Sequence, residues 1–61
     1  MLDSVGQLAD RIELYLRYES ELDPARARAV FGQAGLGAED RVVDVAFRLA
    51  RRRVADERAA S

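Results

Sequence analysis

With 61 residues, of which 49% are hydrophobic and 34% charged, the chain can form one small domain and is too apolar to remain disordered. It contains no cysteine and no histidine, which excludes disulfide bonds, thiolate metal sites and the commonest general base. The net charge of −1 divides into an acidic first third and an arginine-rich last third, which indicates self-complementary packing within a chain or between chains. The total argues against general nucleic-acid binding.

The sequence shows no pattern of a targeting or membrane segment. No apolar run approaches the length of about 18 residues that a membrane span needs. The first residues, MLDSVG, lack the basic and apolar regions of a signal peptide. Arginine is the only basic residue type and alanine is abundant, a composition typical of a GC-rich bacterial genome. We therefore expect a soluble cytoplasmic protein with a single domain over residues 1–61.

A first helix is predicted over residues 5–22. Ser4 and Gln7 have the spacing of a capping box, in which the two side chains satisfy amides at a helix start. On a helical wheel, the apolar residues of this segment fall within one arc of about 140°. The arc consists of Val5, Leu8, Ala9, Ile12, Tyr15, Leu16 and Leu22. Leu14 and Tyr18 lie outside it, four residues apart, and are either two scattered exposed side chains or a contact ridge for a partner.

A second helix is predicted over residues 24–34. Asp23 is suited to the N-cap, and the proline that follows is suited to the first helical position, where its missing amide hydrogen has no helical partner. Gly35 fits the position after a helix that favours a left-handed backbone. This spacing predicts a contact between Leu36 and Phe31, as in a Schellman motif, and assigns both residues to the core.

A third helix is predicted over residues 38–57, with residues 58–61 as a frayed tail. Gly37 is suited to cap this helix, and Glu39 and Asp40 would lie in its first turn, where the helix dipole favours acids. Its apolar residues cover roughly 200° of its circumference, about twice the width that a helix on the outside of a small monomer needs. We therefore expect this helix to contact two neighbours, one of which would be another chain.

Residues 11–19, RIELYLRYE, also alternate between apolar and polar positions as a strand does. With a strand there, the order strand, helix, GL turn, helix over residues 11–54 resembles that of ribbon-helix-helix repressors and antitoxins. The resemblance rests on RIELYLRY, on the helix end AGLG and on VVDVAFRLARRR. It implies a dimer whose paired strands enter the DNA major groove. The residues facing the bases would be Arg11, Glu13, Tyr15 and Arg17.

The sequence indicates no catalytic residues, no metal ligands and no cofactor-binding residues. Its serines have no histidine to activate them, and its glycines lack the lysine and hydroxyl of a phosphate-binding loop. We therefore expect neither enzyme activity nor a cofactor. The one basic cluster is suited either to phosphate contacts or to a solvated helix end. It consists of Arg48, Arg51, Arg52 and Arg53.

These observations together predict an all-α unit of three helices, completed by homodimerisation into a helical bundle. The predicted function is non-enzymatic protein–protein interaction, as a regulator, adaptor or docking protein that binds a second copy or another protein, not a membrane. The alternative is a DNA-binding regulator or antitoxin of the ribbon-helix-helix kind. The predicted core consists of Leu8, Ile12, Leu16, Phe31, Leu36, Val43 and Phe47. The predicted partner interface consists of Leu14, Tyr18, Val42, Val45 and Leu49.

Overall fold

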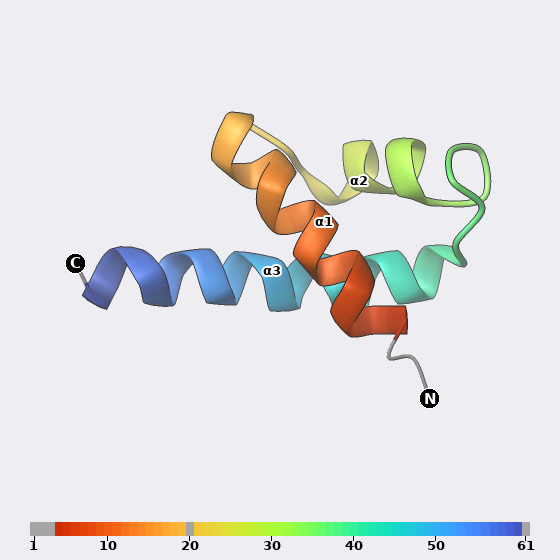
Figure 1. The fold of residues 1–61 in the computed structure, drawn as a ribbon. Helices are drawn as coiled ribbons and strands as arrows, with labels where there is room; N and C mark the ends of the chain where they lie inside the picture. The colour runs from red at the N-terminus through yellow and green to blue at the C-terminus, as the bar shows by residue number, and fades with distance from the viewer. Residues whose placement is uncertain (1–3, 20, 61) are drawn as a thin grey trace.

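A computed structural model describes residues 4–19 and 21–60 of the chain, and this part of the chain is all-α. Its three helices are α1 (Ser4–Tyr18), α2 (Pro24–Phe31) and α3 (Asp40–Ala60). Helix α3 is the longest, and both other helices pack against it. In Figure 1, α1 crosses α3 obliquely, while α2 lies beside α3 and runs in the opposite direction. The prediction of a three-helix all-α fold is confirmed.

The core lies where α1 and α2 meet one side of α3. Its largest fully buried side chains are Phe31, Ile12 and Val43, one from each helix. The other buried apolar residues are Ala9, Leu16, Leu22, Ala27, Ala46, Phe47, Ala50 and Val54. Leu8 is half-buried at the edge of this core. Because four of the buried residues are alanines, few large side chains support the fold, as expected for so short a chain.

Both neighbours of the wide apolar face of α3 belong to the same chain. The buried residues of α3 recur every three or four positions and therefore share one side of the helix. Helix α1 contacts α3 extensively, and α2 contacts it beside α1. Helices α1 and α2 thus cover the buried side of α3, while Val45, which belongs to the same predicted face, is 40% exposed.

Helix α1 ends at Tyr18, four residues earlier than predicted. Leu22 nevertheless reaches the core, through a turn in which its amide donates to the carbonyl of Glu19 at 3.3 Å. The chain turns here before α2, and the proline at the start of α2 disfavours a helical backbone at the residue before it. Asp23 accordingly has an extended backbone, with φ of −113° and ψ of 171°.

The strand that the ribbon-helix-helix resemblance requires over residues 11–19 is wrong. Helix α1 contains this segment up to Tyr18. Ile12 and Leu16 are buried against α3, whereas Leu14, which a two-residue period would place on their side, is exposed. The segment therefore buries its apolar residues with the period of a helix.

The start of α2 agrees with the prediction, but its end does not. The carboxylate of Asp23 accepts a hydrogen bond from the amide of Arg26 at 2.8 Å, and Pro24 is the first helical residue. The helix ends at Phe31, three residues earlier than predicted, because Gly32 adopts an extended backbone with ψ of −162°.

The loop between α2 and α3 folds back on the end of α2. The amides of Leu36 and Ala38 donate to the last two carbonyls of α2, each at 3.1 Å, so the loop satisfies groups that a helix end leaves open. Among the described residues, the one with a positive φ is Gly37, at 89°, and not Gly35 as predicted. Leu36 is 67% exposed, so its assignment to the core is wrong. The backbone amide of Leu36 contacts the end of α2, while the side chain of Leu36 remains exposed to solvent.

Helix α3 begins at Asp40, two residues later than predicted. Glu39 precedes it, and the carbonyl of Glu39 accepts the hydrogen bond from the amide of Val43 at 3.0 Å. The helix continues through residues 58–60, the segment for which a frayed tail was predicted. The last residue of the predicted tail lies outside the described part of the chain.

Ion pairs join α1 to α3. Arg53 of α3 donates to Asp10 at 2.9 Å and approaches Glu13 at 3.5 Å. In the opposite direction, Arg17 of α1 donates to both carboxylate oxygens of Glu57, at 2.6 and 2.8 Å, which raises the pKa of Arg17. The acidic first third and the basic last third of the sequence thus pair within the chain.

Helix α2 is held to its neighbours in the same way. Arg28 donates through Nε and Nη2 to the two carboxylate oxygens of Asp44 in α3, at 2.7 and 2.9 Å. This two-point hydrogen bond lowers the pKa of Asp44 below its ordinary value. Arg26 approaches Glu19, just after α1, at 3.3 Å. These contacts fix the position of α2 beside the other two helices.

Candidate interaction surfaces

Exposed apolar side chains gather on α1, at the end of α2 and in the loop that follows. Leu14 is 53% exposed and Tyr18 is 87% exposed, and exposed Leu36 lies across from them on the loop. With Tyr15 and Val30, these residues border two neighbouring hollows that share Leu14 and Tyr15. We call Leu14, Tyr15, Tyr18, Val30 and Leu36 the apolar strip.

The helical spacing of α1 and one aromatic contact build this strip. Leu14 and Tyr18 are four residues apart and therefore adjacent on the surface of α1. Tyr15 turns toward α2, where its ring meets the ring of Phe31 edge to face, with centroids 5.2 Å apart. Arg11 is the charged residue beside this contact. It lines the hollow that Phe31 and Leu36 also line, which has a volume of about 300 Å³.

The structure divides the predicted partner interface into two places. Leu14 and Tyr18 belong to the apolar strip, and Val42 lines a hollow that adjoins the strip at Leu36. Val45 and Leu49 lie on α3, outside the set of residues that lines these hollows. No single surface therefore contains the whole predicted set.

Three residues of the apolar strip, Tyr15, Val30 and Leu36, were not among the predicted interface residues. Tyr15 falls within the core stripe of the helical wheel, yet it is 39% exposed because it reaches past the edge of α1 toward α2. Leu36 stands between two glycines, and this loop-like setting is the sequence signal that could have placed it outside the core.

The four arginines of the predicted basic cluster do not form one site. Arg53 pairs with the acids of α1. The guanidinium carbon of Arg51 lies 5.8 Å from the centroid of the Phe47 ring, in the range of a cation–π contact. Arg48 and Arg52 are exposed on the outer side of α3. One arginine of the cluster thus pairs with α1, one contacts an aromatic ring, and two are exposed to solvent.

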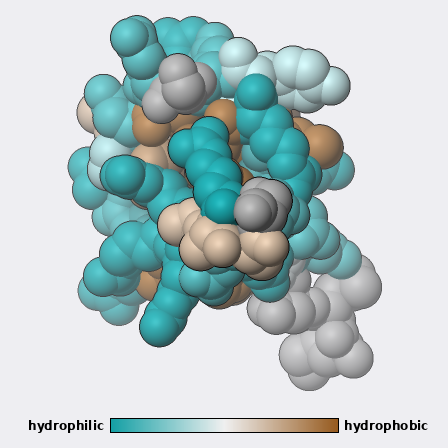
Figure 2. Space-filling view, turned by 90° about the vertical axis from the view of Figure 1, so that its left-hand side faces the viewer, coloured by the Kyte–Doolittle hydropathy of each residue, from teal (hydrophilic) through white to brown (hydrophobic). Residues whose placement is uncertain are grey.

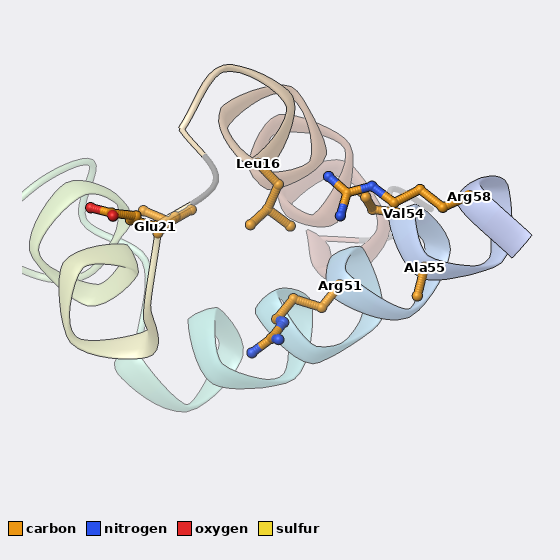
Figure 3. A pocket seen from close by; sticks show the side chains of 7 residues that line it. Leu16, Glu21, Arg51, Val54, Ala55 and Arg58 are labelled. Carbon is orange, nitrogen blue, oxygen red and sulfur yellow. The ribbon is translucent and has the colours of Figure 1, made fainter.

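A hollow of about 290 Å³ opens between the C-terminal parts of α1 and α3 (Figure 3). Leu16 and Val54 form its apolar wall, and the guanidinium groups of Arg51 and Arg58 lie at its edge. The carboxylate of Glu21 points away from both guanidinium groups. Figure 2 shows this end of the molecule, which is mainly hydrophilic with hydrophobic residues visible between the charged ones. Since Leu16 and Val54 belong to the core, the hollow is an open edge of that core.

Within residues 4–19 and 21–60, no group of three or more acidic side chains is placed to hold a metal ion. In the same part of the chain, every buried polar side-chain atom has a hydrogen-bond partner. No described helix combines the length and apolar character needed to cross a membrane.

The fold is that of a small three-helix unit in which one long helix carries two shorter ones. Comparisons with protein-family models, with curated proteins and with solved structures found no significant match to this chain.

Proposed function

We propose that this chain is a non-enzymatic protein–protein interaction module, a small regulator, adaptor or docking protein, that forms a homodimer through the apolar strip. The observation that supports this proposal is the contiguity of exposed Leu14, Tyr18 and Leu36 around shared hollows. Contiguous exposed apolar residues mark interaction surfaces, and tyrosine is enriched where such surfaces are buried on binding.

A second copy is the partner that suits this strip. In a two-fold symmetric dimer the same patch meets itself, so the patch must be self-complementary. An apolar patch satisfies this condition because it brings no like charges together. Arg11 and Glu19 border opposite ends of the strip along α1. Two copies packed antiparallel through this strip would bring Arg11 of each copy toward Glu19 of the other, which would exchange its exposed contact with Arg26 for one across the dimer.

The small core supplies a thermodynamic reason for association. A domain of this length buries a modest share of its surface and gains stability from oligomerisation where disulfides and metals are absent. Covering Tyr18 and Leu14 in a dimer removes apolar area from water and stabilises the folded chain by mass action.

Analytical ultracentrifugation of the full chain tests the proposal. We expect a dimer at micromolar concentration. The double variant Leu14→Ser/Tyr18→Ser should dissociate about 100-fold more readily, because two large side chains lose their burial. The matched control is Val45→Ser, an exposed apolar residue outside the strip, which should leave the dimer unchanged.

Circular dichroism of each variant shows whether it is folded, so that dissociation is not confused with unfolding. A wild-type chain that remains a folded monomer at about 100 μM would overturn the proposal, because this concentration is well above the dissociation constants of specific interfaces. Equal weakening by Val45→Ser would show that the dimer forms through another surface.

A further inference from the structure

The side of α3 that faces away from α1 and α2 carries three exposed arginines. Arg41, Arg48 and Arg52 are exposed, and within residues 4–19 and 21–60 none of them forms an ion pair. Their spacing of seven and four residues places them on one side of the helix, over a length of about 16 Å. Val45, which is 40% exposed, lies among them. We call Arg41, Val45, Arg48 and Arg52 the basic face.

The ion pairs between the helices explain why this face keeps its charge. Arg17, Arg28 and Arg53 each hold a carboxylate of a neighbouring helix. Arg48 contributes to the lowered pKa of Asp44, but Arg28 forms the hydrogen bonds to that carboxylate. Asp10, Asp44 and Glu57 thus serve contacts between helices, whereas Arg41, Arg48 and Arg52 remain exposed on the outer side of α3.

We propose that the basic face binds an acidic helical segment of a different protein. Such a segment would present carboxylates to the three guanidinium groups and an apolar side chain to Val45. Guanidinium groups form strong two-point hydrogen bonds with carboxylates, so three of them along one helix select a partner with acids at matching helical spacing. This binding site is separate from the apolar strip and does not depend on the homodimer.

A second copy of the chain does not suit the basic face. Two-fold symmetric pairing would place Arg48 and Arg52 of one copy against the arginines of the other, and such like-charge contacts are unfavourable. The basic face therefore differs from the apolar strip, which can meet itself without charge repulsion.

Nucleic acid suits this face less well than an acidic protein segment does. Binding to a phosphate backbone normally rests on a larger cationic surface. A phosphate backbone also offers no apolar group to Val45, whereas an amphipathic helix does.

Fluorescence anisotropy with a synthetic peptide tests this inference. The probe is a fluorescein-labelled helical peptide of glutamate, alanine and leucine, with its glutamates at helical spacing around a central leucine. The same composition in scrambled order serves as the peptide control. The test variant is Arg48→Gln/Arg52→Gln, and the matched control is Arg26→Gln/Arg51→Gln, which removes the same charge from side chains outside the basic face and the apolar strip.

We expect the ordered peptide to bind more tightly than the scrambled one. The test variant should lose affinity about ten-fold, because two exposed charge pairs are removed, and the control variant should lose much less. Val45→Ser should also weaken binding of the ordered peptide while leaving the charge unchanged.

Three results would overturn the inference. Equal losses in the two double variants would mean that the peptide responds only to overall charge. Tighter binding of a labelled DNA duplex than of the peptide would assign the face to phosphate contacts. Absence of saturable binding of the ordered peptide would show that the face does not take an acidic helix.

Discussion

The ring of Tyr15 stands edge-on to the ring of Phe31, with an angle of 82° between the ring planes. Phe31 is almost fully buried, whereas Tyr15 is partly exposed, so this contact connects the core to the apolar strip. Such aromatic pairs contribute about 0.5–1.5 kcal/mol beyond the area that they bury. The shape of the strip therefore depends on how α2 packs, although most of its exposed side chains belong to α1.

Phe31→Ala should lower the free energy of unfolding by about 3–5 kcal/mol, the cost of removing a buried aromatic side chain from a core. Urea denaturation followed by circular dichroism measures this loss. Val45→Ala is the control on an exposed position and should change stability by less than about 0.5 kcal/mol. A loss below about 1 kcal/mol for Phe31→Ala would mean that α2 does not pack as described here.

Two glycines in the loop between α2 and α3 should respond differently to alanine. Gly37 has a positive φ and open space around it, so Gly37→Ala should cost only backbone strain, about 1–2 kcal/mol. A Cβ atom at Gly35 would overlap with the carbonyl of Val30, so Gly35→Ala should displace the loop and cost more. Thermal unfolding of both variants shows which substitution destabilises the chain more. A smaller effect at Gly35 than at Gly37 would contradict the close approach of the loop to α2.

The parts of the fold that local chemistry decides could be read from the sequence. The Asp-Pro pair marks the start of α2 because the capping bond and the proline ring act within a few residues. Ile12 and Leu16 indicate the buried side of α1 because a helix repeats every three to four residues. Both signals depend only on neighbours along the chain.

The ends of α1 and α2 could not be read in this way. Phe31 ends α2 because the loop amides replace the helical donors of its last turn, and this depends on how the loop folds in space. Tyr18 ends α1 because the chain must turn there to bring Leu22 to the core. Helix propensity alone therefore predicts neither of these two helix ends.

The exposure of surface side chains was predictable to a similar, partial extent. Leu14 and Tyr18 fall outside the apolar stripe of α1, and both are exposed. The separation of Arg53 from Arg48 and Arg52 could not be read from the sequence, because it depends on where the acids of α1 come to lie. Consecutive arginines on a helix point in different directions, and only the packing shows which ones remain in solvent.

The stability of the chain should depend on pH through the contact between Arg28 and Asp44. The hydrogen bonds from Arg28 lower the pKa of Asp44 from its ordinary value of 3.8, so the unfolded chain binds this proton more tightly than the folded chain does. Stability from this pair is therefore present above pH 3.8 and is lost as the pH falls through the lower pKa of the folded state.

The variant Asp44→Asn isolates this contribution, because it keeps the shape of the side chain and removes its charge. Near neutral pH the variant should unfold at a lower temperature than the wild type, and the difference should shrink once the pH falls to about 2. Arg28→Gln should show the same pattern, since it removes the other partner. The control Asp56→Asn changes an acid that forms no ion pair among the described residues, so its difference from the wild type should vary less with pH. A constant difference between wild type and Asp44→Asn across this range would show that the carboxylate does not stabilise the fold through its charge.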